Sequence, residues 1–178
     1  YFGKYPNIIR KNRNSIAIIN ENDGAEELNT LGNDIFQYFG LGCRSVSKLY
    51  FPKGYKIDTF FEAILDDFQD VTQNNKYANN YDYNKAVYLM GNNQLLDNGF
   101  LLLKEDPAFT SPVGVLNYEF YDSLETLNAQ LEIKKEELQC VVSSKNTALD
   151  TLAFGEAQCP ALNDYADGVD TIEFLLKL

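Results

Sequence analysis

Apolar residues along this chain follow two alternating patterns. Short runs rich in β-branched and aromatic residues, bounded by polar clusters, predict buried strands. These runs are Ser15–Asn20, Val46–Phe51, Phe100–Leu103, Val113–Phe120 and Leu138–Val142. In the segments between them, apolar residues recur every three or four positions, as on one face of a helix. These segments are Ala25–Phe39, Ile57–Val71, Tyr83–Leu96 and a helix that begins at Ser123. The alternation predicts an α/β fold with a mainly parallel sheet and flanking helices.

Three polar or terminal segments complete this prediction. Asp23 is followed three residues later by Glu26, which resembles a capping box at the start of the first helix. Residues 72–84 are rich in Asn and Tyr, and we expect a surface turn or a helix start there. The tail from Phe154 combines turns with the apolar run Ile172–Leu176. No repeat or low-complexity linker interrupts the sequence, so we expect one domain over residues 1–178.

Composition narrows the class of protein. The 178 residues are 45% hydrophobic, enough for one sizeable core. No apolar run is long enough for a membrane span, and the start does not resemble a signal peptide. The net charge of −11 argues against a nucleic-acid partner. The one basic cluster, at Arg10, Lys11 and Arg13, is typical of a solvated loop.

Cysteine and histidine counts limit the chemistry. Three widely spaced cysteines do not suggest a disulfide framework, which favours the reducing cytoplasm as the location. The absence of histidine excludes a Ser-His-Asp triad, a Cys-His dyad and a histidine-ligated zinc within this chain. The acidic stretches at residues 20–24 and 163–168 do not match the calcium-loop spacing, and we expect no metal site. Asp164, Asp167 and Asp170 are interpreted as turn and cap residues.

The sequence Gly40-Leu41-Gly42-Cys43 stands between a predicted helix and a predicted strand. Glycine at a helix end permits the left-handed conformation that closes the helix. A cysteine at such an uncrowded junction is a candidate nucleophile, although many free cysteines are simply small buried hydrophobes. Without histidine, a thiolate would need another source of stabilisation. Candidates are Arg44, Lys48, a helix N-terminus or a group outside this chain.

Residues 10–52 resemble the catalytic half of the aldehyde dehydrogenase superfamily. That family has a strand, an acidic turn, an amphipathic helix, Gly-x-Cys and a second strand in this order. Ser111-Pro112-Val113, followed by residues 120–125, resembles the family's Gly-Pro-Val strand and the next helix. Residues 35–49 are more specifically similar to bacterial acyl-CoA reductases of the LuxC type, which act on long-chain fatty acyl groups. Residues 154–158 and 164–171 are similar to the C-terminus of that branch.

Two departures from the family pattern bear on its chemistry. The resemblance places Arg10 where most members carry the glutamate that activates water to hydrolyse the acyl-enzyme. Loss of that base suits an enzyme that reduces its acyl group. The glutamate that precedes Gly-Pro-Val and contacts the nicotinamide ribose also has no clear counterpart. Ala108 lies nearest to that position, with Glu105 three residues before it.

The resemblance implies an aldehyde dehydrogenase-like catalytic domain in which Cys43 attacks an acyl-CoA and Gly42 and Arg44 support its loop. NADPH would then reduce the bound acyl group to the aldehyde. Since no strand–GxGxxG–helix unit is present, NADPH would be bound mainly by an N-terminal dinucleotide-binding half that these residues lack. We therefore expect that half as a partner, an inactive isolated fragment, and exposed apolar surface that could support a homo-oligomer.

Two other interpretations remain open from the sequence. The chain could use the same scaffold for other aldehyde dehydrogenase-type chemistry, for example on phosphorylated acyl donors attracted by the cluster at residues 10–13. It could also be a non-catalytic α/β interaction module in which Cys43 is only packed. The absence of histidine and of both family glutamates supports this last interpretation.

Overall fold

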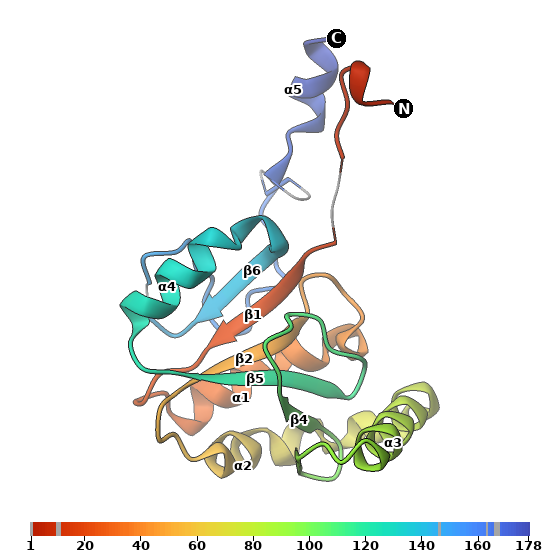
Figure 1. The fold of residues 1–178 in the computed structure, drawn as a ribbon, viewed down its shortest axis with the longest axis vertical. Coiled ribbons are helices and arrows are strands. Elements are labelled where there is room, and N and C mark those ends of the chain that lie inside the picture. Colours follow the sequence, from red (N-terminus) through yellow and green to blue (C-terminus); the bar gives the residue numbers. More distant parts are fainter. Residues whose placement is uncertain (1, 10–11, 146, 163, 166–167) are drawn as a thin grey trace.

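A six-stranded sheet runs through the middle of the protein, with helices on both faces (Figure 1). The computed structural model describes residues 2–9, 12–145, 147–162, 164–165 and 168–178. The strands lie in the order β3-β4-β5-β2-β1-β6, and only the β3–β4 pair is antiparallel. Their bounds are β1 (Asn14–Ile18), β2 (Val46–Pro52), β3 (Leu95–Asp97), β4 (Leu102–Glu105), β5 (Val115–Tyr121) and β6 (Leu138–Ser143).

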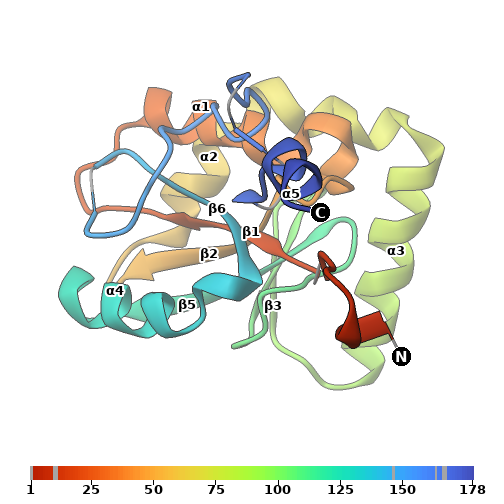
Figure 2. The same cartoon turned by 90° about the horizontal axis from the view of Figure 1, so that it is seen from above.

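Helices α1, α2 and α3 pack on one face of the sheet, and α4 packs on the other (Figure 2). The bounds are α1 (Ala25–Phe36), α2 (Ile57–Phe68), α3 (Asn75–Met90), α4 (Leu124–Ile133) and α5 (Thr171–Leu176). Short 3-10 segments are η1 (Phe2–Lys4), η2 (Gln37–Gly40), η3 (Gln69–Gln73) and η4 (Lys135–Glu137). The predicted α/β fold with a mainly parallel sheet is confirmed.

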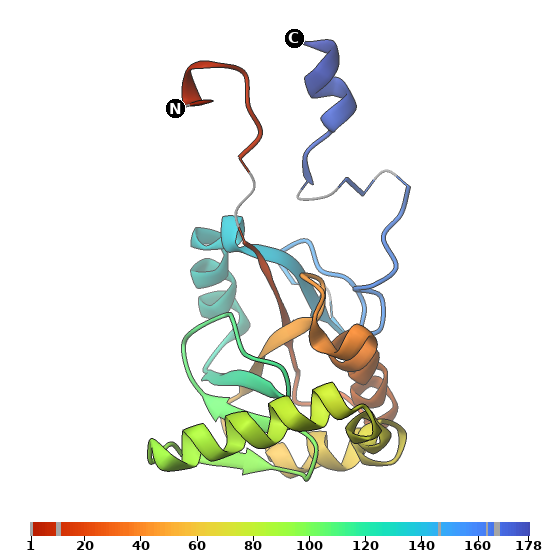
Figure 3. The ribbon, with the colours of Figure 1, turned by 90° about the vertical axis from the view of Figure 1, so that its right-hand side faces the viewer.

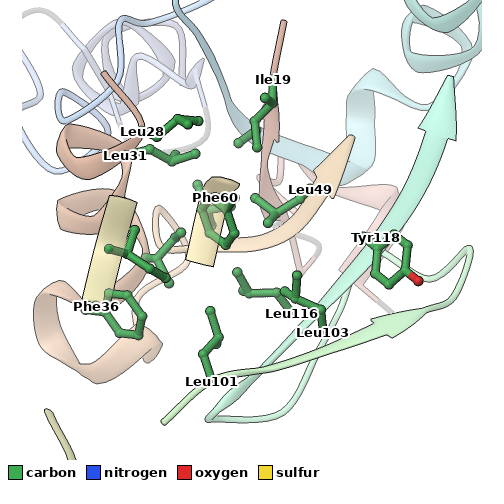
Figure 4. Close-up of a cluster of buried hydrophobic side chains, with 14 of the residues drawn as sticks. Ile19, Leu28, Leu31, Phe36, Leu49, Phe60, Leu101, Leu103, Leu116 and Tyr118 are labelled. Carbon is green, nitrogen blue, oxygen red and sulfur yellow. The ribbon is translucent and has the colours of Figure 1, made fainter. Parts of the chain in front are cut away.

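The larger core lies between the sheet and the first three helices (Figure 4). Leu28 and Leu31 of α1 and Phe60 of α2 are fully buried there. They pack in one cluster with side chains of the central strands, including Leu49 and Leu116. Strand β1 is buried on both faces, which explains why residues 16–19 form an uninterrupted apolar run.

Helix α3 differs from the sequence prediction. It begins at Asn75 and ends at Met90, whereas the apolar spacing predicts a helix over 83–96. The Asn74 side chain accepts hydrogen bonds from the backbone N–H groups of Lys76 and Tyr77, at 3.0 and 3.2 Å, and so caps the helix. Its buried face consists of tyrosine and asparagine rather than aliphatic residues, so hydropathy does not show its period.

The start of α1 also differs from the prediction. The Glu27 carboxylate, rather than that of Glu26, accepts from the backbone N–H of the N-cap residue Gly24, at 2.8 Å. Asp23 instead accepts from the backbone N–H of Asn20, at 2.8 Å, and so closes the turn after β1. The prediction that a helix starts here is therefore correct, but the capping contact joins Gly24 and Glu27, one residue later than the predicted pair Asp23 and Glu26.

Both ends of the chain extend away from the sheet on the same side of the molecule (Figure 3). Helix α5 has no buried residue, and Ile172, Leu175 and Leu176 on it are exposed. Asp170 caps this helix by accepting from the backbone N–H of Glu173, as its interpretation as a cap residue predicts. None of the helices in the described part of the chain is both long and apolar enough to cross a membrane.

Candidate functional site

Cys43 lies on the connection between α1 and β2. Helix α1 ends at Phe36, three residues before the predicted end, because Tyr38, Phe39 and Gly40 all adopt left-handed backbone conformations with φ of 55°, 59° and 71°. Glycine takes this conformation readily, but for each aromatic residue it costs roughly 1–3 kcal/mol of free energy. Such strained residues are concentrated at functional sites, so this turn marks the following loop as a candidate.

A tight turn presents the Cys43 side chain to solvent. The backbone N–H of Ser45 donates to the Gly42 carbonyl at 3.0 Å, and the N–H of Gly42 donates to Ser45 Oγ at 3.2 Å. From β1, the buried Ser15 hydroxyl donates to the Cys43 carbonyl at 2.9 Å. The Cys43 backbone is thus fixed to the sheet while its thiol stays exposed. A packed cysteine would be buried, as Cys140 is.

The segment Phe154–Gln158 packs against the Cys43 loop. The backbone N–H groups of Gly155 and Ala157 donate to the Asp34 carboxylate of α1, at 2.6 and 2.9 Å. Gln158 Nε2 donates to Ser45 Oγ at 3.2 Å. The two sequence segments that carry the resemblance to acyl-CoA reductases are therefore neighbours in space.

Arg44 links the loop to this C-terminal segment. Its Nε donates to the Ala157 carbonyl, and its Nη2 lies 3.1 Å from the Asp164 carboxylate. The Arg44 side chain is 16% exposed and that of Asp164 is 42% exposed, so the ion pair stands at the surface and contributes little by itself. Asp164 thus has an ion-pair partner that its interpretation as a turn residue did not include. Arg10, Lys11 and Asp167 lie outside the described residues.

Lys48 is not part of the Cys43 loop. Its ammonium pairs with the Glu119 carboxylate and donates to the Asp106 carbonyl at 3.0 Å. It also lies 5.0 Å from the centre of the Tyr50 ring. Burial lowers the pKa of Lys48, and the pairing with Glu119 opposes that effect. These contacts correct the expectation that Lys48 is a candidate to stabilise a Cys43 thiolate.

A hollow of about 490 Å³ lies beside Cys43, which is large enough for part of a small-molecule substrate. Three segments line it: residues 12–14, residues 40–47 without Arg44 and Val46, and residues 110–113, together with Gln139. Arg13 is the charged residue on this lining, and the described residues that form it include no carboxylate. The predicted Ser-Pro-Val motif and the predicted cysteine loop therefore border one space.

A second hollow, of about 440 Å³, lies next to the first and shares Arg13 and Gln139 with it. Arg44, Cys140 and Asp164 are among its other lining residues. Burial raises the pKa of the Cys140 thiol, which disfavours its reactive thiolate form.

The site lies at the amino ends of the parallel strands. Ser15 and Val46 pair at the starts of β1 and β2, and residues 110–113 lead into β5. Open α/β sheets more commonly bind ligands beyond the carboxyl ends of their strands. This general rule predicts a site at the carboxyl ends of the strands, whereas the glycine–cysteine motif predicts one at their amino ends.

Asp34 and Ser15 are site residues that the sequence analysis did not identify. Asp34 had a visible signal, because it is an acidic residue three positions after Leu31, on the apolar face of α1. In the structure its side chain is fully buried. Ser15 had none, since its contact with Cys43 joins residues 28 positions apart.

No protein-family model matches this sequence, and no curated protein matches it. Among solved structures, the chain is similar to an NAD-dependent aldehyde dehydrogenase from Burkholderia multivorans, with a TM-score of 0.53 and 14% identity. That match covers 90% of this chain and 38% of the other. The chain is also similar to the Delta-pyrroline-5-carboxylate dehydrogenase from Mycobacterium tuberculosis, with a TM-score of 0.46, 12% identity and coverage of 75% and 30%. The chain thus spans 30 to 38% of the length of these structures. Its fold is similar to that of a segment of the Burkholderia multivorans enzyme.

Proposed function

We propose that this chain is the cysteine-bearing segment of an aldehyde dehydrogenase-type oxidoreductase that reduces a fatty acyl-CoA to the aldehyde. The observation that carries the proposal is the exposed thiol of Cys43, in the loop that follows the strained turn at residues 38–40 and beside a hollow of about 490 Å³. The fold shared with the Burkholderia multivorans enzyme supports the choice of reaction class.

In the proposed reaction, the Cys43 thiolate attacks the thioester carbonyl of the acyl-CoA. A carbon–sulfur bond to Cys43 forms, the bond to coenzyme A breaks, and coenzyme A leaves as its thiol after taking up a proton. The backbone N–H of Cys43 would stabilise the oxyanion that develops during attack. One donor of this kind contributes on the order of 10²–10³ in rate.

A nicotinamide cofactor, NADPH in this proposal, supplies the hydride that takes the bound acyl group to the aldehyde level. The hollow beside Cys43 has room for a nicotinamide ring, and residues 110–113 with the loop at 40–43 would surround it. The dinucleotide itself would be held by a separate N-terminal half, since the sequence has no strand–GxGxxG–helix unit. Collapse of the reduced adduct then frees the aldehyde and restores the thiol.

The lining of the hollow favours reduction over hydrolysis. A water molecule that attacks an acyl-enzyme needs a general base within hydrogen-bond reach. The described residues around the hollow offer hydroxyls, amides and Arg13, but neither Asp nor Glu. This agrees with the departure at Arg10 in the sequence, and both features favour an acyl group that persists until it is reduced.

A phosphorylated acyl donor is the second candidate substrate, because Arg13 lines the same hollow and could pair with a phosphate. Both substrates would give the same acyl-enzyme on Cys43. They differ only in the leaving group, so one experiment separates them.

The proposal is tested by intact mass spectrometry of the full-length protein after incubation with acyl-CoA and without nicotinamide. We expect one acyl-sized adduct that is absent from Cys43→Ser and retained in Cys159→Ser, a matched change at the other exposed cysteine. An adduct formed only from acyl phosphates would select the second candidate. No adduct from either donor across short, medium and long chains would show that Cys43 is not an acyl acceptor.

A further inference from the structure

Asp34 is a buried carboxylate that the proposed chemistry does not use. It lies on the core side of α1 with no exposed surface. Each of its oxygens accepts one backbone hydrogen bond, from Gly155 at 2.6 Å and from Ala157 at 2.9 Å. These contacts span 121 and 123 positions of sequence, so Asp34 fixes a distant segment to the helix that precedes the Cys43 loop.

The segment held by Asp34 in turn contacts both neighbours of the nucleophile. The Ala157 carbonyl accepts from Arg44 Nε, directly after Cys43. Gln158 donates to Ser45 Oγ, and the same oxygen accepts from the backbone N–H of Gly42, directly before Cys43. A continuous set of hydrogen bonds therefore connects the Asp34 carboxylate to residues on each side of the thiol.

We propose that Asp34 is a positioning residue that holds the Cys43 loop in its reactive geometry through residues 155–158. The inference rests on the proposed function, since it gives Asp34 a role in acyl transfer. It does not require Asp34 to touch a substrate. It requires that loss of the two backbone bonds at Asp34 be transmitted to the turn at residues 42–45.

The chemistry of the contact explains why a carboxylate is needed. An ionised carboxylate offers two acceptor oxygens, whereas an asparagine side chain would place an N–H group against one of the two backbone N–H groups. A buried donor without an acceptor costs about 1–3 kcal/mol. Burial raises the pKa of Asp34 to about 6, and the nearby Glu156 adds to this effect, so the carboxylate form predominates at neutral pH.

Asp34→Asn tests the proposal, with Asp66→Asn at an exposed position on α2 as the matched control. Hydrogen exchange of the full-length protein, followed by mass spectrometry, reports on peptides covering residues 40–46 and 154–158. We expect roughly tenfold faster exchange in both peptides for Asp34→Asn and none of this change for the control.

The second measurement is the single-turnover rate of acyl transfer from acyl-CoA. We expect the maximal rate to fall by about 10- to 100-fold in Asp34→Asn, as for a misplaced nucleophile. The acyl-CoA concentration for half-maximal rate should change less than about twofold, because the substrate surface is intact. A purely structural role would lower the melting temperature without this separation of rate from affinity.

Gln158→Ala provides a second route if Asp34→Asn does not fold, because it removes one partly buried side chain at the other end of the same connection. It should also accelerate exchange at residues 40–46 and slow acyl transfer. Unchanged exchange at residues 40–46, or unchanged acyl transfer in a folded variant, would overturn the inference. If the wild-type protein accepts no acyl group, the proposed function fails, and exchange alone then decides whether Asp34 fixes the loop.

Discussion

At the scale of single residues, the environment separates chemically identical groups. Cys43 and Cys140 border neighbouring hollows, yet one thiol is exposed and the other is buried. Asp34 and Asp66 are carboxylates on adjacent helices, but only Asp34 is enclosed by backbone donors. The residue type determines which chemistry is possible, and burial and hydrogen bonding determine which of several identical side chains can perform it.

The raised pKa of Asp34 predicts a pH dependence of stability. The folded protein holds a proton on Asp34 up to about pH 6, whereas the ordinary value of 3.8 applies when the chain is unfolded. Between these values the folded state binds more protons, so the contribution of Asp34 to the free energy of unfolding decreases as pH rises from about 4 to 6.

Urea unfolding from pH 4 to 7.5 measures this effect in wild type and in Asp34→Asn. The difference in unfolding free energy, wild type minus variant, should fall through this window and level off above about pH 7. The raised pKa of Asp23 affects both proteins equally and cancels in the difference. A difference that stays constant with pH would contradict the prediction.

The residues of the loop were predictable from sequence, but their support was not. Gly42, Cys43 and Arg44 stand out because glycine spacing and a helix–strand junction are local features. The partners of the loop, Ser15 and Gln158, lie 28 and 113 positions away from the residues they contact. Contacts between residues so far apart leave no local pattern in the sequence.

At the scale of elements, prediction succeeded where apolar side chains define the period. The runs that form β1, β2 and the first four residues of β5 are largely buried, so their aliphatic and aromatic residues mark them clearly. Helix α3 was misplaced because its buried positions include Tyr77, Tyr81 and Asn84, which hydropathy scores as weakly apolar or polar.

Gly155 joins the C-terminal segment to α1 and tolerates little change. Its φ is +85°, and a Cβ there would approach Thr30 Cγ2 to 2.6 Å. Gly155→Ala should therefore destabilise the protein through both strain and overlap, by about 2–4 kcal/mol. Gly54→Ala is the control, since Gly54 has φ of +83° and no atom within 4 Å of the added Cβ.

Thermal unfolding of the two variants separates the two causes. Gly54→Ala should lose only the cost of the left-handed backbone, about 1–2 kcal/mol. Equal losses for both variants would mean that Thr30 moves aside freely, and that residues 154–158 are held less firmly against α1 than these contacts imply.

At the scale of the whole molecule, the sheet with helices α1–α4 (the body) depends on buried packing for its stability, whereas the C-terminal helix α5 does not. The sheet and helices α1–α4 bury the core, whereas α5 contributes no buried residue. Hydrophobic stabilisation follows the apolar area that is removed from water. Helix α5 should accordingly add little to the stability of the body.

Deletion of residues 171–178 tests this expectation. The melting temperature should stay within about 2 °C of the full chain, because α5 has no buried residue and changes at exposed positions usually alter stability by less than about 0.5 kcal/mol. Sedimentation velocity on the same pair shows whether the exposed Ile172, Leu175 and Leu176 support self-association. A large fall in melting temperature would show that α5 packs on the body in solution.

The site assembled around Ser45 has a consequence for how the protein is made. Gln158 follows Ser45 by 113 positions, and chains are synthesised at roughly 5–20 residues per second. Cys43 therefore leaves the ribosome many seconds before the segment that braces its loop exists. During translation the thiol is therefore present before Gln158 can contact Ser45, and the loop gains this support only once nearly the whole of this chain has emerged.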